Sequence, residues 1–404
     1  MRICGIVSEY NPFHSGHEWH ITQTRKITGA DLIVCVMSAS FVQRGEPAVF
    51  DKWTRAACAL LCGADAVVEL PLLSAIQSAE GFAQGGVAVL RALGADSISF
   101  GSETSDSDLL IRAAGTLADE SEGFKSMLRK FLDEGVSFPT ARLKAAVAEG
   151  HGAWSDAVSE ILSQPNAILG IEYIKAILQS GADITPYAVQ RTGSAYHSAD
   201  IEESVPSATA LRTAFKSGQP EKALAATPAA CRSFVLTQME AGLTPAFPES
   251  FDTTLLFALR RGGRDYISSL HEVTEGLENR IFDAAQHCVT REELIAEIKT
   301  KRYAYTRLSR ILLYALLGIT REDILRHNRE PFNYIRVLGV SEPGVLSALT
   351  KSCSVPLIAG SIANSSYPAL DAAATDVWAL SQNDAPFRDG YQDYTHKLLI
   401  ASQL

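Results

Sequence analysis

Short apolar segments alternate with longer, partly polar segments over the first hundred residues. Four apolar segments have the length and β-branched composition of buried strands: 2–8, 31–37, 66–71 and 96–100. Three intervening segments have the composition of helices that end near a glycine: 17–26, 52–62 and 78–93. This alternation predicts a doubly wound α/β fold with a parallel sheet, in which ligands bind at the carboxyl ends of the strands.

The pattern beyond residue 106 indicates more helix. Helices are expected over most of 106–162, with a break at 137–139, and then over 168–178 and 207–216. A strand is expected between the last two of these helices, over 185–190.

Proline and glycine mark a change of composition after residue 218, and helical periodicity resumes at residue 252. Neither internal repeats nor low-complexity segments occur. We therefore predict an α/β domain over 1–218, a connecting segment over 219–251 and a mainly helical domain over 252–404.

The composition fits a globular chain with two or three domains. The 404 residues are 47% hydrophobic and carry a formal net charge of -10, which argues against broad coating of nucleic acid but not against a local basic surface. No apolar run reaches the ~18 residues of a transmembrane helix, and the N-terminal segment lacks the features of a signal peptide. We expect a cytoplasmic protein without a membrane partner.

The seven cysteines are scattered, which favours small buried thiols in a reducing compartment. Cys58 and Cys62 lie one helical turn apart, a spacing that two metal ligands can use. Because no second cysteine pair or histidine lies near them in the sequence, packing in the core is the preferred interpretation.

The main chemical signal is His14-Ser15-Gly16-His17, between the first predicted strand and helix. Gly16 lets the backbone approach a ligand, the helix N-terminus favours a phosphate, and the histidines can donate hydrogen bonds to it. The alternative is that His14 and His17 only cap the helix. His20 extends the histidine set, but no zinc spacing is present and no metal site is predicted.

A second signal is the segment from Ser207 to Arg212. The hydroxyls of Ser207 and Thr209 at a helix start, with Arg212 one turn later, can hold triphosphate oxygens. The alternative is an ordinary helix cap followed by an exposed arginine.

These two motifs and several longer strings make a resemblance specific. An HxGH motif followed by an S/T-x-x-R helix resembles the nucleotidyltransferase superfamily of α/β phosphodiesterase-like enzymes. The longer strings resemble the bacterial tRNA(Met) cytidine acetate ligase family over nearly the whole chain. They are GIVSEYNPFHSGH at 5–17, FVQRGEPA at 41–48, DKWTR at 51–55, GSE at 101–103, PNAILGIEY at 165–173, QR at 190–191, KRYAYTR at 301–307 and YIRVLG at 334–339.

The resemblance implies a HUP-type, nucleotidyltransferase-like domain that binds ATP, followed by a helical tRNA-binding domain. It also implies a carbon–nitrogen bond-forming ligase that activates acetate as acetyl-adenylate and acetylates N4 of the wobble cytidine of elongator tRNA(Met). The expected partners are this tRNA, acetate and ATP, the last with Mg²⁺. Two positions depart from the family pattern: Ser15 stands where Asn is frequent, and Ala167 where Asn or Asp is frequent.

The expected ATP site combines the motifs with the resemblance. His14 and His17 are the expected catalytic residues at the phosphates, Asn166 can read a base or ribose, and Arg191 can grip a carboxylate or phosphate or form only a surface ion pair. The full set is Gly5, Ile6, Val7, Ser8, Glu9, Tyr10, Asn11, Pro12, Phe13, His14, Ser15, Gly16, His17, Glu18, Gly101, Asn166, Arg191, Ser207, Thr209 and Arg212. The loop 43–46 and the pair Asp51-Lys52 are candidates for the acetate or tRNA side.

A basic, tyrosine-bearing stretch is the expected tRNA-binding surface, since cations neutralise phosphate and aromatic faces stack on unpaired bases. Its residues are Lys299, Lys301, Arg302, Tyr303, Tyr305, Arg307 and Arg310, with Arg336 further on. The alternative is a charged face of an amphipathic helix.

Two other functions use the same first domain. One is a metabolic adenylyltransferase that joins AMP to a small phosphorylated acceptor, and the other is an ATP-sensing RNA-binding module. The length of the second domain and its basic stretch favour the RNA-modifying ligase.

Overall fold

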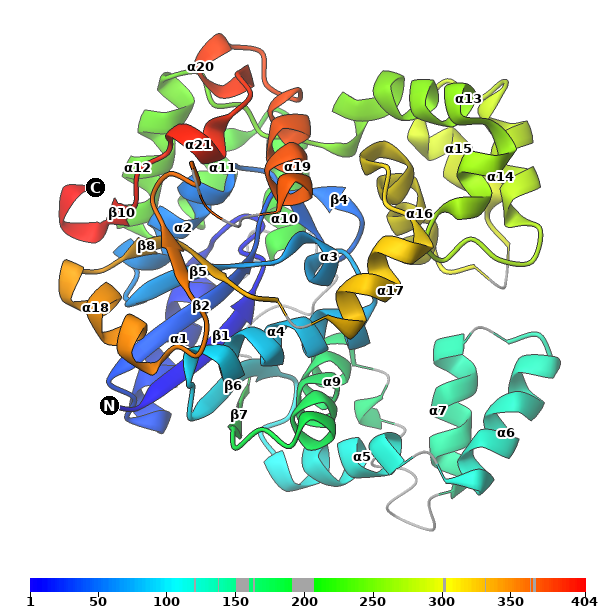
Figure 1. The fold of residues 1–404 in the computed structure, drawn as a ribbon, viewed down its shortest axis with the longest axis horizontal. Helices are drawn as coiled ribbons and strands as arrows, with labels where there is room; N and C mark the ends of the chain where they lie inside the picture. The colour runs from blue at the N-terminus through cyan, green and yellow to red at the C-terminus, as the bar shows by residue number, and fades with distance from the viewer. Residues whose placement is uncertain are drawn as a thin grey trace.

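The structure is a computed structural model of the 404-residue chain. It describes residues 1–119, 121–136, 138–149, 160–162, 164–190, 207–300, 303–330, 332–363, 365 and 368–404. Figure 1 shows a central sheet with helices around it and a separate group of helices at the upper right.

One sheet organises the molecule, with the strand order β10-β8-β5-β2-β1-β6-β7. The first five strands of this sheet along the chain are β1 (Ile3–Ser8), β2 (Leu32–Ser38), β5 (Ala66–Leu70), β6 (Ser97–Ser102) and β7 (Thr185–Gln190). These five pair in parallel, so the predicted doubly wound sheet is confirmed. The strand order reverses direction between β1 and β6, and such a switch point is where open α/β sheets bind ligands.

Four helices pack on this sheet: α1 (Ser15–Thr28), α2 (Lys52–Leu61), α4 (Ala79–Leu93) and α9 (Pro165–Ser180). Helix α1 contacts β1 and β2, and α2 contacts β5 and β8. Helices α4 and α9 pack against each other, with α4 drawn in front of the sheet in Figure 1. The chain moves across the sheet from β1 through β2 to β5, and then returns past β1 to β6. Because crossovers between parallel strands are right-handed, this change of direction places the connecting helices on opposite faces of the sheet.

Shorter elements connect this frame. A hairpin of β3 (Phe41–Val42) and β4 (Glu46–Pro47) follows β2. The remaining helices of this part are α3 (Leu72–Ala75), α5 (Ser107–Asp119), α6 (Glu122–Asp133), α7 (Phe138–Glu149), α10 (Ala208–Lys216), α11 (Pro220–Ala225) and α12 (Ala229–Glu240). Helices α6 and α7 pack against each other and lie at the lower right of Figure 1.

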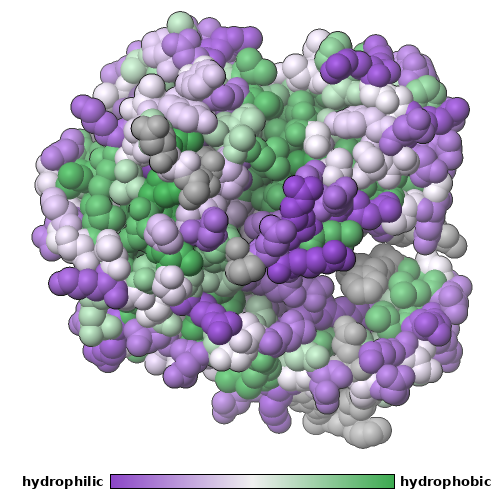
Figure 2. All heavy atoms as spheres, in the orientation of Figure 1, coloured by the Kyte–Doolittle hydropathy of each residue, from purple (hydrophilic) through white to green (hydrophobic). Residues whose placement is uncertain are grey.

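The predicted helical region begins with a short 3₁₀ turn, η1 (Pro248–Phe251), and continues as four helices that pack together. They are α13 (Asp252–Ser269), α14 (Leu277–Ala285), α15 (Arg291–Ile298) and α16 (Tyr305–Leu317). Helix α17 (Arg321–Arg329) then leads back and contacts α3. Figure 2 shows a strongly hydrophilic strip of surface over α17. No described helix is both long and apolar enough to cross a membrane.

The chain beyond residue 334 returns to the sheet, which the sequence pattern did not anticipate. Strand β8 (Ile335–Val340) is buried throughout and pairs antiparallel with β5, while β9 (Leu357–Ala359) and β10 (Leu399–Ile400) pair in parallel with β8. The other elements here are α18 (Pro343–Ser352), α19 (Ala369–Ala379), α20 (Ala385–Arg388), α21 (Gln392–Thr395) and η2 (Ala401–Gln403). The region from residue 252 is mainly helical, as expected, but it also adds three strands to the central sheet.

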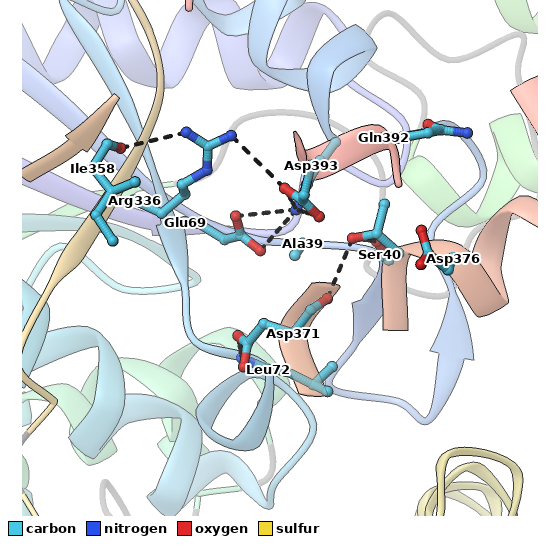
Figure 3. Close-up of polar contacts among 12 residues, drawn as sticks. Ala39, Ser40, Glu69, Leu72, Arg336, Ile358, Asp371, Asp376, Gln392 and Asp393 are labelled. Carbon is cyan, nitrogen blue, oxygen red and sulfur yellow. Dashed lines mark hydrogen bonds and ion pairs between the residues drawn. The ribbon is translucent and has the colours of Figure 1, made fainter. Parts of the chain in front are cut away.

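A buried ion network fastens this returning segment (Figure 3). The Lys52 ammonium of α2 lies 3.1 Å from Glu69 of β5 and 2.8 Å from Asp393 of α21. Arg336 of β8 lies 3.8 Å from the same Asp393 carboxylate. All four side chains are at most 2% exposed. Charges removed from water this completely need close partners, so the network ties α2, β5, β8 and α21 together.

Helix α19 adds neutral contacts to the same interface. Trp378 donates to the carbonyl of Ala48 at 2.7 Å, and the Asp371 carboxylate accepts from the backbone N–H of Leu72 at 2.8 Å. Burial raises the pKa of Asp371 to about 7. Helix α19 thus holds the segment that follows the β3–β4 hairpin.

Candidate functional site

A cavity of about 460 Å³ lies at the carboxyl ends of β1 and β6. Most of the expected ATP-binding residues line it. They are Ile6, Val7, Ser8, Glu9, Tyr10, Asn11, His14, Ser15, Gly16, His17, Gly101, Asn166, Ser207, Thr209 and Arg212. The structure therefore brings together residues separated by some 200 positions along the chain at the switch point of the sheet.

The two motif histidines form the cap of helix α1. His14 Nδ1 accepts from the backbone N–H of Gly16 at 3.0 Å, and His17 Nδ1 accepts from the backbone N–H of His14 at 3.2 Å. The two rings lie against each other at a tilt of 33° with their centroids 3.8 Å apart, and Tyr10 packs edge-on against His17. The histidines therefore cap the helix, as the alternative interpretation proposed, and also line the cavity.

Capping also determines which ring nitrogens can donate. A neutral imidazole that accepts at Nδ1 carries its proton on Nε2. His14 and His17 thus each have an Nε2–H donor beside a helix N-terminus, where the partial positive charge favours an anion. This arrangement suits a phosphate group.

The loop after β1 is held from beneath by Arg55 of α2, which is 1% exposed. Its guanidinium donates to the carbonyls of Glu9 at 2.7 Å and Ser38 at 2.9 Å, and also to that of Ala39. Burial lowers the pKa of Arg55 to about 10, which leaves the side chain charged at neutral pH. Arg55 therefore fixes the carboxyl ends of β1 and β2 without lining the cavity.

Two side chains of this loop make contacts with the following hairpin region. The Glu9 carboxylate accepts from the backbone N–H of Gln43 at 2.8 Å, and Asn11 accepts from that of Val49 at 2.7 Å. Burial raises the pKa of Glu9, while the Gln43 N–H and the nearby arginines Arg44, Arg212 and Arg55 oppose this shift. The three arginines thus only partly offset the effect of burial on the Glu9 carboxylate.

Asn166 is held at the start of α9 by Glu103. The Asn166 side-chain amide donates to Glu103 at 2.7 Å, and the backbone N–H of Ala167 donates to the same carboxylate at 2.8 Å. Ala167 is buried, so this position contributes its backbone rather than a side chain. The GSE string thereby orients the PNA string at the rim of the cavity.

Helix α10 brings the second motif to the cavity. Ser207 caps the helix by accepting from the backbone N–H of Ala210 at 3.2 Å. Arg212 donates to the carbonyl of Asn11 at 2.8 Å and to the Thr209 hydroxyl at 3.0 Å. The arginine is therefore not simply exposed on a capped helix: it joins α10 to the loop after β1.

Some expected residues do not line the cavity. Gly5 lies against α4, where a Cβ atom would be 2.1 Å from Leu90 Cδ2, so it serves packing. Pro12, Phe13 and Glu18 are also absent from the lining, and Phe13 is buried at 2% exposure. Arg191 lies outside the residues that the structure describes.

Other lining residues were not among the expected ATP contacts. Gln43, Arg44 and Glu46 of the hairpin were candidates for the acetate or tRNA side. His20 was considered only as an extension of the histidine motif. The remaining ones were missed: Trp19, Val42, Phe82, Phe100, Leu169, Tyr173, Val189 and Ala208. Most are apolar or aromatic side chains at helix or strand positions, which a sequence pattern assigns to the core.

The expectation that the basic stretch forms an open surface for tRNA must be corrected in part, because several of its residues are buried. Arg310 is 8% exposed and forms an ion pair with Glu272 at 2.8 Å, and Arg336 belongs to the buried network with Asp393. Tyr303 is 7% exposed. These three side chains serve internal contacts and do not form an open basic surface.

The rest of that stretch is more accessible. Lys299 is exposed, while Tyr305 and Arg307 are half-buried. Tyr305 donates to Glu292 at 2.8 Å, and Arg307 donates to the carbonyl of Glu272 at 2.8 Å. Lys301 and Arg302 lie outside the described residues.

The cysteines behave as core residues. Cys58 and Cys62 are buried, as expected, and Cys62 Sγ lies 3.1 Å from Cys231 Sγ. Among the described residues, the one group of three possible metal ligands is His287, Cys288 and Glu297, in the helical region and not in the cavity lining.

Comparison with known proteins defines first the class and then the family. A sequence model of the HIGH nucleotidyl transferases matches residues 1–393, so the chain belongs to that family. A tRNA(Met) cytidine acetate ligase of Acetivibrio thermocellus is 38% identical over 99% of this chain and 100% of its own length. One of Halothermothrix orenii is 38% identical over 89% and 87%, respectively. Within the HIGH class, the chain belongs to the tRNA(Met) cytidine acetate ligase family.

Solved structures agree with this assignment. The apo crystal structure of Thermotoga maritima TmcAL superposes with a TM-score of 0.93, at 31% identity and over 99% of this chain and 100% of that one. A second crystal form, with α-thio ATP bound, superposes with a TM-score of 0.90 over the same shares.

Proposed function

We propose that this protein is an ATP-dependent ligase that acetylates N4 of the wobble cytidine of elongator tRNA(Met). The observation that carries the proposal is the pair of histidines that cap helix α1 at the switch-point cavity. The relatives of the chain bear the name of this activity. The relative that superposes over nearly the whole chain binds an ATP analogue.

The reaction would proceed in two steps. A carboxylate oxygen of acetate forms a bond to the α-phosphorus of ATP, and the bond to the leaving pyrophosphate breaks. The exocyclic amine of cytidine then attacks the acetyl carbonyl, AMP leaves with the bonding electrons of the acyl–oxygen bond, and the new amide nitrogen loses a proton. The Nε2–H donors of His14 and His17 would stabilise the charge that develops on the α-phosphate.

The ATP site of this proposal consists of the expected residues that line the cavity. Arg212 and the hydroxyl of Thr209 suit the outer phosphates, and Asn166 beside Gly101 suits the nucleoside. ATP would enter as its Mg²⁺ complex, with the ion as part of the substrate. Arg191 remains a candidate from the sequence.

The tRNA surface of this proposal is narrower than the sequence suggested. It keeps the exposed Lys299 and the half-buried Tyr305 and Arg307, together with Lys301 and Arg302 from the sequence. The helical region that carries these residues also contacts the β3–β4 hairpin, because Ser309 of α16 donates to the carbonyl of Arg44 at 2.5 Å. RNA bound there would lie near the hairpin that lines the cavity.

The test is transfer of ¹⁴C-labelled acetate to purified transcripts in the presence of ATP. We expect label in elongator tRNA(Met) and none in a transcript whose wobble cytidine is replaced by uridine, because uridine lacks the exocyclic amine. Label that enters a small phosphorylated acceptor instead, or both transcripts equally, would contradict the proposal.

A further inference from the structure

The cavity extends beyond the histidine pair to the part of the sheet covered by α4 and α9. The Val7 side chain of β1 faces α4, since a Cβ atom on Gly86 would lie 2.8 Å from Val7 Cγ2. Phe82 of α4, Phe100 of β6 and Tyr173 of α9 line this part of the cavity. The cavity thus has two parts. One lies at the N-terminus of α1 with His14 and His17, and the other, called the aromatic part, is lined by Phe82, Phe100 and Tyr173.

The aromatic part contains a hydroxyl that lacks a partner within the described structure. Tyr173 is 1% exposed, and none of the described residues forms a hydrogen bond with its hydroxyl. Its ring packs against Phe100 with the centroids 5.8 Å apart, which fixes the ring in place. A buried hydroxyl without a partner is costly, and a ligand that supplies an acceptor removes that cost.

The hydroxyl keeps its proton at neutral pH and can therefore donate a hydrogen bond. Burial raises the pKa of Tyr173 well above its usual value, and the negative charge of Glu9 raises it further. A ligand that presents an acceptor can therefore pair with this hydroxyl, and a carboxylate oxygen is a strong acceptor.

We propose that the aromatic part of the cavity is the acetate subsite, in which the Tyr173 hydroxyl donates to the acetate carboxylate. This inference rests on the proposed function. The methyl group would pack against Phe82 and Phe100, and Arg44, which lines the same cavity, would offset the carboxylate charge. A small acid with one apolar end and one anionic end matches this combination of walls.

The subsite places the reacting atoms next to each other. Ser8 and Glu9, at the carboxyl end of β1, line the same cavity as the histidines and the aromatic residues. One acetate oxygen would accept from Tyr173 while the other attacks the α-phosphorus held at His14 and His17. Tyr173 keeps its proton throughout, so it binds and orients acetate rather than acting as a base.

The main test is Tyr173→Phe, assayed by acetate-dependent exchange of labelled pyrophosphate into ATP. We expect the KM for acetate to rise about 10- to 100-fold, as for loss of one hydrogen bond to a charged group, while the KM for ATP stays unchanged. The melting temperature should not fall, because the hydroxyl has no partner in the described protein. A rise in the KM for ATP alone would assign Tyr173 to the nucleotide and overturn the proposal.

Tyr266→Phe is the matched control. The Tyr266 hydroxyl donates to the carbonyl of Ala315 at 2.5 Å within the helical region, so its removal should lower stability and leave both KM values unchanged. Wild-type protein that catalyses no acetate-dependent exchange would overturn the proposed function itself, a result distinct from any change specific to the Tyr173 variant.

The second test concerns acid size. Phe82→Ala removes one aromatic wall, and we expect the ratio of kcat/KM for propionate to that for acetate to rise at least about tenfold, the order of selectivity that one methylene provides. An unchanged ratio would contradict the aromatic wall as the boundary of the subsite.

Discussion

Helix α2 contributes one cation to each of two groups of buried polar residues, and the two groups differ in whether every side chain has a polar partner within the described protein. At one end, Lys52 lies in an ion network where Glu69, Asp393 and Arg336 are close enough to balance one another. Further along, Arg55 holds the loop of a cavity, and that cavity includes a Tyr173 hydroxyl without a partner among the described residues. The closed group stabilises the fold, whereas the open group offers donors to a ligand. Substitutions in the two groups should therefore have separable effects.

The largest expected effect is on stability and comes from Lys52→Met. Removal of the ammonium leaves the buried carboxylates of Glu69 and Asp393 without their shared cation, so we expect unfolding to require about 3–5 kcal/mol less free energy. Urea denaturation followed by circular dichroism measures this value.

Lys125→Met is the matched control, because Lys125 forms an ion pair with Glu122 in which both side chains are more than half exposed. Exposed pairs contribute little. Equal, small losses in the two variants would show that the network is not what fastens the returning segment.

The next effect is on catalysis and comes from His17→Ala. We expect pyrophosphate exchange to slow about 100- to 1000-fold, as for a donor used mainly in the transition state, with a loss of stability of only about 1 kcal/mol from the helix cap. His287→Ala, in an exposed pair with Glu297, should change neither rate nor ATP affinity. Equal losses in ATP affinity and turnover would show that His17 serves ground-state binding.

The pH dependence of stability should reveal Asp371. Burial raises its folded-state pKa from 3.8 to about 7. The folded protein therefore binds more protons than the unfolded chain between these values, and this carboxyl loses its stabilising contribution as the pH rises from about 4 to about 7.

Asp371→Asn keeps an oxygen for the Leu72 N–H and cannot ionise. Relative to the wild type, this variant should gain about 2–4 kcal/mol of stability between pH 4.5 and pH 8. Chemical denaturation at both pH values measures the change. A constant difference between the two proteins would show that Asp371 does not titrate in this range.

The smallest expected effect is on RNA affinity. Lys299→Glu reverses an exposed charge in the proposed tRNA surface, so we expect the Kd for tRNA to rise roughly fivefold, with a smaller dependence on salt. Lys222→Glu changes an exposed lysine of α11 and should leave the Kd unchanged in filter-binding assays. Equal effects would indicate only nonspecific attraction.

The sequence predicted the residues that line the cavity best where these residues are close together along the chain. The strand ending at Ser8, the loop, and the helix starting at Ser15 are contiguous, so the HxGH motif could be placed at a strand end without knowledge of distant contacts. Arg212 was found because its own helix carries a recognisable motif.

The sequence did not predict which basic residues are buried, because their burial depends on contacts between distant parts of the chain. Arg310 and Arg336 belong to a basic pattern, but their carboxylate partners, Glu272 and Asp393, lie far away in the sequence. A count of charges cannot separate cations paired inside the protein from cations exposed to RNA.

Tyr173 and Phe82 were missed for a related reason. Each lies on an amphipathic helix, where an aromatic residue is normally part of the core. Their place beside the cavity follows from the packing of α4 against α9, which no local pattern encodes.

The most direct test of the account is the exchange of labelled pyrophosphate into ATP by the wild-type protein without tRNA. We predict that exchange depends on acetate, because the proposed function places activation in the switch-point cavity before RNA participates. Exchange that is absent with acetate alone, but appears when a phosphorylated metabolite is supplied, would contradict the account.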